Sequence, residues 1–278
     1  MSSERRPPGG GSAGACEPAV VVSLRFLGTG GARWVVAKQI RSSGGFWLTA
    51  DGTNIHVDPG PGALVRALSQ VPPCDPAALD AIVLSHKHLD HSGDINAMIE
   101  AMCQGGWRPR GALCAPRDAL DEAQQPVVLP YARRFVQREW IVEANGGPFE
   151  VGSVTLHASL RLQHPVEVYG LHFHAPEATV SYLPCTRYFD AIVDDYRAHA
   201  PDVLVMNVLR YRDSMDVDHL TYDDARTLID GIKPGVAIMS HFGTRMLERD
   251  PKRLAYELED ATGIKTYAAY DGWVYDAA

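Results

Sequence analysis

The sequence predicts an α/β fold in which two β-sheets pack face to face and helices cover both outer faces. Two observations predict this fold: short apolar segments typical of strands alternate with helical segments, and the alternation occurs in two successive blocks. The chain has 278 residues, of which 46% are hydrophobic. That length suits one large domain with a sizeable core, or two small domains.

The first block contains most of the predicted strands. Strands are expected at residues 20–27, 45–48, 53–57, 79–84, 111–115 and 138–143, and helices at residues 62–68 and 94–102. The stretch 104–148 is the hardest to interpret. Its sequence indicates no chemistry of its own.

The second block continues the same alternation. Strands are expected at residues 153–160, 167–173, 179–183, 203–208 and 236–239, and helices at residues 189–198, 222–231 and 251–262. Thr221 provides a hydroxyl cap before two acidic residues in the first turn of its helix. Pro251 suits the first turn of the last helix and Gly263 suits its end.

The beginning of the chain differs in composition from the rest. Residues 1–19 are expected to form a disordered tail, because this stretch is rich in Gly, Ser, Pro and Arg and has no apolar core. The same composition argues against a secretory signal. The sequence has no run of about eighteen apolar residues, so no membrane span is expected.

Cysteine usage and charge indicate the compartment and the class of partner. The five cysteines are odd in number, scattered in spacing and without a Cys-x-x-Cys pair, which predicts a reducing cytoplasm. The net charge of −8 and the pI near 5.7 disfavour binding of long nucleic acids. A small phosphorylated substrate stays compatible, because bound dications supply local positive charge.

The segment Ser-His-Lys-His-Leu-Asp-His at residues 85–91 carries the strongest chemical signal. It places three imidazoles and a carboxylate directly after a predicted strand. Residues two apart point the same way in an extended segment, so His86 and His88 can bind one cation. Asp90 and His91, on the turn that follows, then face a second cation. The alternative is a polar surface turn, which the spacing of the histidines disfavours.

This motif resembles the His-x-His-x-Asp-His signature of the metallo-β-lactamase superfamily, and further motifs of that family occur in the right order. Ile-His-Val-Asp-Pro-Gly at residues 55–60 resembles the strand that ends in the family's first motif, where Asp58 orients ligands without binding metal. His164 lies where the third motif's histidine is expected. His241, just past an apolar strand, matches the fifth motif.

The resemblance covers residues 20–278 and implies one domain with the αββα fold, a sandwich of two mixed sheets flanked by helices. It implies two adjacent metal sites, formed by His86, His88 and His164 and by Asp90, His91 and His241. Zinc is the expected metal, with one or two ions per chain, and manganese or iron are alternatives. Redox members of the superfamily usually carry a glutamate where His88 stands, so oxygen or nitric oxide reduction is disfavoured.

Cys185 is a departure from the family's fourth motif. Most hydrolases of the family carry there an aspartate that bridges two metals. One interpretation is a thiolate ligand, which favours zinc, because a cysteine beside a dication is readily deprotonated. The other is a small buried thiol and one tightly bound metal. Whether Asp190, Asp271 or His174 replaces the missing carboxylate is left open.

The implied reaction is hydrolysis by a metal-activated hydroxide. Three neutral imidazoles leave zinc with an open position, and zinc held in this way lowers the pKa of water to about 7. The candidate catalytic residues are Asp90 and His219.

Two segments resemble the ribonuclease Z and cyclic-phosphodiesterase branch and favour a small phosphodiester as substrate. Residues 26–32 resemble that branch's opening strand and glycine turn. His219, in a His-Leu-Thr sequence before a helix, resembles the branch's extra histidine, which approaches the scissile phosphate. The resemblance makes His219 a candidate general acid or phosphate contact, and a helix-capping or surface histidine is the alternative.

Two other functions stay open. The chain is either a hydrolase of a carboxylic ester, thioester, lactone or amide, or a non-catalytic metal-binding protein in which Cys185 has weakened the site. The expected partner is a small-molecule substrate. The family also implies a homodimer.

Overall fold

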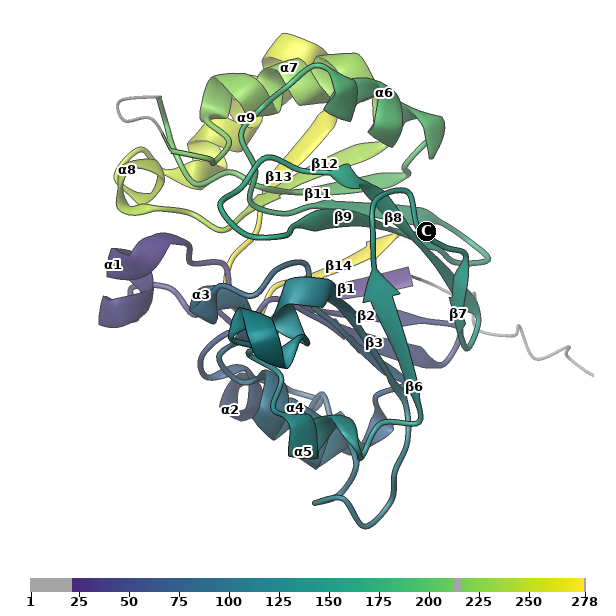
Figure 1. The fold of residues 1–278 in the computed structure, drawn as a ribbon. Helices are drawn as coiled ribbons and strands as arrows, with labels where there is room; N and C mark the ends of the chain where they lie inside the picture. Colours follow the sequence, from purple (N-terminus) through teal and green to yellow (C-terminus); the bar gives the residue numbers. More distant parts are fainter. Residues whose placement is uncertain (1–21, 213–216, 278) are drawn as a thin grey trace, which may run out of the picture.

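The structure is a computed structural model that describes residues 22–212 and 217–277. The predicted tail at residues 1–19 lies outside this range. Two seven-stranded mixed sheets pack face to face, and helices cover both outer faces (Figure 1). The predicted αββα sandwich is therefore confirmed.

The first sheet has the strand order β14-β1-β2-β3-β4-β5-β6. Its strands are β1 Val22–Phe26, β2 Phe46–Ala50, β3 Thr53–Val57, β4 Ala81–Val83, β5 Ala112–Pro116, β6 Arg138–Val142 and β14 Val274–Ala277. The pairs from β14 to β3 are antiparallel, and the pairs from β3 to β6 are parallel.

The second sheet has the strand order β13-β12-β11-β10-β9-β8-β7. Its strands are β7 Phe149–Val151, β8 Val154–Arg161, β9 Tyr169–His174, β10 Thr179–Leu183, β11 Val203–Asn207, β12 Val236–Ser240 and β13 Lys265–Ala268. The pairs from β7 to β10 are antiparallel and the pairs from β10 to β13 are parallel, so both sheets combine the two kinds of pairing.

Helices cover the two outer faces, and the buried apolar residues form three clusters. The helices are α1 Ala32–Lys38, α2 Ala63–Leu68, α3 Leu89–Ser92, α4 Ile95–Met102, α5 Pro130–Arg133, α6 Ala191–Ala198, α7 Tyr222–Ile232, α8 Thr244–Leu247 and α9 Pro251–Thr262. One cluster fills the space between the sheets, and the others lie under α6, α7 and α9 and under α2 and α4. No helix in the described ranges is long and apolar enough to cross a membrane.

The predicted elements are present, and each begins and ends within two residues of its expected bounds. Thr221 and Asp224 form a capping box at the start of α7, as the hydroxyl and acid pattern indicated. Gly263 ends α9 in the left-handed conformation, with φ of 71°.

Seven elements were missed, namely α1, α3, α5, α8, β7, β13 and β14. All are short, and the two C-terminal strands are half-exposed, so none forms a clear apolar run. β14 leaves the second block and pairs with β1. That pairing is tertiary and has no local sequence signal.

Several strand ends that carry polar residues meet at one edge of the sandwich. β3, β4, β10 and β12 each take part in parallel pairing, and each is followed at once by a segment with candidate ligands. The helices α1, α3 and α8 lie together at this edge (Figure 1, left). The sheets thus provide a rigid scaffold for functional loops.

Candidate metal centre

The motif at residues 85–91 leaves β4 in an extended conformation and then enters a helix. His88 is the N-cap residue of α3, with extended backbone dihedrals, and Asp90 and His91 lie in the short helix itself. The extended part therefore presents His86 and His88, and the helical part presents Asp90 and His91. This change of backbone conformation divides the four side chains into two pairs.

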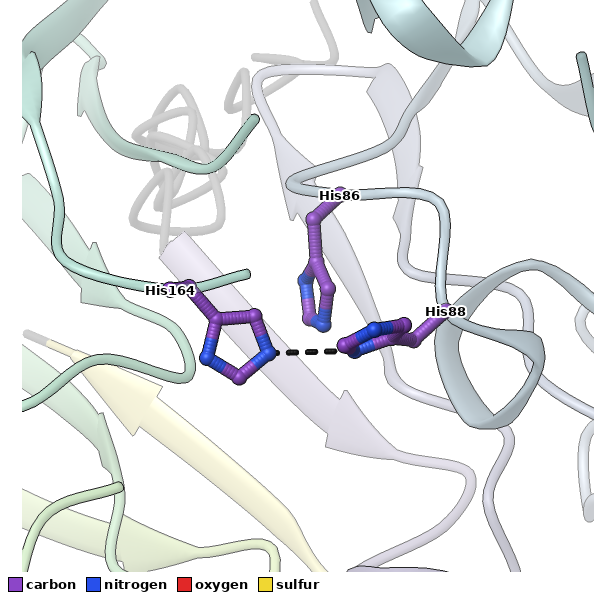
Figure 2. A group of neighbouring side chains, drawn as sticks. All are labelled: His86, His88 and His164. Atoms are coloured by element: carbon purple, nitrogen blue, oxygen red, sulfur yellow. Dashed lines mark hydrogen bonds between the residues drawn. The ribbon is translucent and has the colours of Figure 1, made fainter. Parts of the chain in front are cut away.

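His86, His88 and His164 converge on a common space (Figure 2). The ring centroids are 5.0 Å apart for His86 and His88, 5.1 Å for His86 and His164, and 4.8 Å for His88 and His164. The Nε2 atom of His164 lies 3.0 Å from Nδ1 of His88, while its Nδ1 contacts the carbonyl oxygen of Asp218 at 2.9 Å. The other ring nitrogen is thus fixed by the backbone, as is usual for a metal-binding imidazole.

Asp90, His91 and His241 form an adjacent group. The Oδ2 atom of Asp90 lies 3.8 Å from Nε2 of His91 and 3.6 Å from Nε2 of His241. The centroids of His86 and His91 are only 4.1 Å apart, so the two groups are direct neighbours. The structure therefore brings together the six side chains that the sequence assigned to two metal ions.

The protonation of the imidazoles fits metal binding. Burial lowers the pKa of His86 and of His241 well below the usual value, so both rings are neutral at pH 7. Their Nε2 atoms are buried and have no hydrogen-bond partner among the described residues. A buried, unpaired nitrogen is costly, and a cation between the rings removes this cost.

His91 differs from the other rings. Burial disfavours its charged form, but the neighbouring Cys185, Asp90 and Asp58 raise the pKa of His91 well above the usual value. These neighbours favour the protonated form of the ring. Metal binding replaces such a proton, because a ligand imidazole must be neutral.

Asp58 lies behind His91 and contacts several groups at once. It accepts hydrogen bonds from the backbone amide and the hydroxyl of Ser85, both at 2.7 Å, and from Tyr182 at 2.8 Å. Its Oδ2 atom also lies 2.9 Å from Nδ1 of His91. Asp58 thus fixes the orientation of His91 and belongs to none of the ligand groups.

Two strained residues direct side chains into the centre. Asp58 follows β3 with φ of 53°, and His241 follows β12 with φ of 61°. Non-glycine residues in this region cost about 1–3 kcal/mol each and cluster at functional sites. Gly31 packs against His241 so closely that a Cβ atom would lie 2.4 Å from its carbonyl oxygen. The glycine turn before α1 therefore supports His241 by close backbone approach.

Cys185 lies between the two groups. Its Sγ atom is 3.5 Å from Nε2 of His91 and 3.6 Å from Nδ2 of Asn207, and the residue is 1% exposed. It belongs to one group with His86 and His91 and to another with His219 and His241. Burial raises the pKa of the thiol, so a nearby cation is needed to make it a thiolate.

His219 lies at the rim of the centre. Its ring is perpendicular to that of His164 at a centroid distance of 5.2 Å, and its buried Nδ1 has no hydrogen-bond partner in the described part of the chain. Burial lowers its pKa to about 4. The residue is half-buried, and Thr221, not His219, is the N-cap of α7. The role of His219 as a phosphate contact stays a prediction. The sequence did not indicate that His219 also lies within ligand distance of Cys185 and His241.

Sequence reasoning also missed Tyr182 and Asn207. Asn207 donates to the hydroxyl of Tyr182 at 3.0 Å, and Tyr182 donates to Asp58. Both residues lie in apolar strands. Their only sequence signal is a polar group at a strand position whose side chain faces the centre. The three further candidates for the missing carboxylate lie outside the ligand groups of the described residues: Asp190, Asp271 and His174.

Comparison with known proteins agrees with this geometry. A family model described as beta-lactamase superfamily domain matches residues 53–242, which is more than half of the chain. The chain therefore belongs to the metallo-β-lactamase superfamily.

Two relatives match by sequence. The uncharacterized protein MJ1374 of Methanocaldococcus jannaschii is 28% identical over 252 residues, covering 89% of this chain and 92% of that protein. The probable metallo-hydrolase YhfI of Bacillus subtilis is 23% identical over 203 residues, covering 72% of this chain and 80% of YhfI.

Solved structures share the fold. The crystal structure of Bacillus subtilis YhfI matches with a TM-score of 0.73 and 20% identity, covering 92% of this chain and 100% of that one. A diphosphatase from the PhnP family matches at 0.66 with 19% identity, over 92% and 97% of the two chains. The short form of human tRNase Z matches at 0.66 with 15% identity, over 91% and 98%.

Proposed function

We propose that this protein is a metal-dependent hydrolase that acts on a small phosphodiester. One observation carries the proposal: six ligand side chains from separate loops converge in two neighbouring groups, with buried imidazole nitrogens that have no hydrogen-bond partner in the part of the chain that the structure describes. The name of YhfI, a probable metallo-hydrolase, supports the same reaction class.

The donor set favours zinc. The groups offer imidazole nitrogens, one carboxylate and the thiol of Cys185, and zinc is the ion that accepts all three kinds of ligand. His86, His88 and His164 would hold one ion, and Asp90, His91 and His241 the other. When bound, the cations supply Lewis acidity and make hydroxide available at neutral pH.

The residues of the chain keep this centre in a single arrangement. Burial disfavours a charge on Asp90, but the neighbouring His91 and His241 lower its pKa, so its carboxylate is ionised at neutral pH. Asp90 is thereby ready to bind metal or to accept a hydrogen bond from the attacking group. Asp58, Ser85 and Tyr182 hold His91 in one tautomer and orientation.

His219 supplies a polar contact at the rim. With a pKa of about 4 the ring is neutral at pH 7, so it donates a hydrogen bond from one nitrogen instead of carrying a full charge. An N–H directed at a phosphoryl oxygen stabilises the charge that develops there. We therefore assign His219 as a substrate contact and not as a protonated general acid.

Several observations favour a small phosphodiester. Two fold relatives, the PhnP-family diphosphatase and human tRNase Z, are named for phosphate chemistry, and His219 lies where a phosphate contact is useful. The net charge of −8 disfavours a long nucleic acid. The proposal includes a cytoplasmic protein that acts as a homodimer, as the sequence and the family led us to expect.

The test is a substrate panel with the metal-loaded full chain. Bis-aryl phosphate, aryl ester and lactone substrates are compared for the wild type, His219→Ala and Asp194→Asn, with metal content measured in each preparation. Asp194 is the control, because it is an exposed residue that belongs to none of the ligand groups. We expect diester turnover to fall by about 10²-fold or more in His219→Ala and to be unchanged in Asp194→Asn.

The other outcomes select the alternative functions. Turnover of esters or lactones alone, unaffected by His219→Ala, would identify a carbon-centred hydrolase. Metal binding with no turnover of any substrate would identify a non-catalytic metal-binding protein.

A further inference from the structure

A second cluster of imidazoles lies on the outer face of the second sheet. Leu171 and Phe173 of β9 belong to the core between the sheets, so His172 and His174 point to the opposite face. The same alternation in β8 turns His157 outward. α6 packs over β8 (Figure 1). His199 is the C-cap residue of α6.

This cluster is separate from the metal centre. β9 begins at Tyr169, whose amide donates to the carbonyl oxygen of Ser85, and it ends at His174. The strand spans about 16 Å at about 3.3 Å per residue. The second cluster therefore lies at the other end of the strand.

The arrangement of three rings resembles that of the first metal group. The centroids are 5.3 Å apart for His157 and His174, 5.8 Å for His157 and His199, and 5.3 Å for His174 and His199. The corresponding distances in the metal centre are 4.8 to 5.1 Å. All three rings are half-buried, so an ion can reach them from solvent.

The nitrogen atoms repeat the pattern seen at His164. Nε2 of His174 lies 3.0 Å from Nδ1 of His199, while Nδ1 of His174 contacts the hydroxyl of Thr179 at 3.2 Å. Two ligands of a tetrahedral zinc ion lie about 3.3 Å apart when the bonds are about 2.0–2.1 Å. The Thr179 contact holds the other ring nitrogen, which leaves Nε2 directed at the shared space.

His172 lies beneath the cluster, against His199. Its ring stacks on that of His199 at 3.6 Å and 8°, and its own Nε2 is buried without a hydrogen-bond partner within the described residues. The nearest acidic atom is Oδ2 of Asp195, at 3.9 Å. A fully buried imidazole nitrogen without a partner indicates that the polar groups here are not yet satisfied.

We propose that His157, His174 and His199 form a second binding site for one transition-metal cation such as Zn²⁺ or Ni²⁺. His174 and His199 are already placed to share the ion. The ligand atoms of the three rings do not all lie within 4.8 Å of one another, as those of the metal centre do, so the His157 ring must turn on binding. The ion would link β8 and β9 to the end of α6.

Titration of the full-length protein with Ni²⁺, after its metal centre has been filled with zinc, tests the site. We expect the wild type to bind one additional equivalent, and His174→Gln and His199→Gln each to weaken this binding at least about tenfold. The matched control is Asp194→Asn, an exposed residue of the same helix, which should bind as the wild type does. Zinc content of the centre and hydrolysis should be unchanged in all three variants.

A second measurement needs no variant. In wild-type protein labelled with ¹⁵N-histidine, Nε2 of His174 and Nδ1 of His199 should shift on adding the additional equivalent, while His56, which lies in neither cluster, should not. Shifts confined to the metal centre, or equal Ni²⁺ affinity in wild type and variants, would show that these rings are only hydrogen-bonded to one another.

Discussion

The two histidine clusters of this protein use similar ring spacings but differ in how they are supported. In the metal centre, ligands come from loops after strand ends and are backed by Asp58, Ser85 and Tyr182. In the second cluster, His157 lies inside β8, His174 is the last residue of β9, and Thr179 holds one ring nitrogen.

The difference between the clusters shows how hydrogen bonds from outer residues hold ligand side chains in place. In the metal centre the ligand atoms of each group lie within 4.8 Å of one another, whereas those of the three rings in the second cluster do not, so one of these rings must move. A centre whose ligands are held in place by outer contacts binds metal without reorganisation. We therefore expect tight binding and catalysis at the first cluster, and weaker binding without catalysis at the second.

The largest expected effect comes from exchanging one ligand in each cluster. His86→Gln removes a buried ligand of the metal centre, and we expect diester hydrolysis to fall by more than about 10²-fold, because even an outer contact is worth 10–100-fold. His174→Gln should leave kcat/KM within about twofold, since an independent distant site contributes little. Steady-state kinetics on metal-loaded protein measures both. Equal losses would contradict the distinction between the clusters.

The outer contacts provide the next test. Asp58→Asn removes the carboxylate behind His91, and we expect zinc affinity and hydrolysis to fall by about 10–100-fold. Thr179→Val removes the outer contact of His174. It should reduce only the Ni²⁺ affinity of the second cluster, and by a smaller factor than Asp58→Asn reduces zinc affinity. Competition with a chromogenic chelator gives both affinities. Unchanged zinc affinity in Asp58→Asn would show that His91 needs no orienting partner.

Cys185 is a further difference between the clusters, because the second cluster contains no thiol. Exchanging Cys185→Asp replaces a soft donor by a hard one, so we expect several-fold weaker zinc binding and relatively better binding of manganese. Metal content and affinity per chain are measured for wild type, Cys185→Asp and a control, Cys114→Ala, which lies in the core. Unchanged metal content and affinity in Cys185→Asp would remove the thiolate ligand.

The last test concerns stability and lies outside both clusters. Burial lowers the pKa of His56 to about 4 from the usual 6.5. Between these pH values His56 is protonated in the unfolded chain but neutral in the folded one. Its contribution to the free energy of unfolding is therefore full above pH 6.5 and is lost as the pH falls to 4. For this fully buried ring, the free energy of unfolding falls by about 3 kcal/mol over this pH range. Unfolding of metal-free protein against pH measures it, and an NMR pKa near 6.5 for His56 would contradict it.

The sequence predicted the fold class and most elements because strands and helices of this chain carry clear apolar periodicity. The segment at residues 85–91 also divides into two pairs of side chains, as expected, but Asp90 and His91 lie in the short helix α3 and not on a turn. The pairing of β14 with β1 was not predictable, because partner choice between distant strands is a tertiary property.

The hydrogen-bond network that supports the metal centre was also not predictable from the sequence. Tyr182 and Asn207 lie within buried strands, where a polar residue in an apolar run is the only signal, and their partners come from other strands. The second cluster was missed for the same reason. His157, His174 and His199 are widely separated in sequence and form no motif, and strand register and helix packing bring them together.

The proposed function requires two cations among the six ligands of the metal centre. Crystals of the zinc-loaded protein, measured at the zinc absorption edge, show directly whether these ions are bound. We expect anomalous peaks within bonding distance of the group with His86, His88 and His164 and of the group with Asp90, His91 and His241. Zinc-loaded crystals with no anomalous peak at either group would contradict the proposed function.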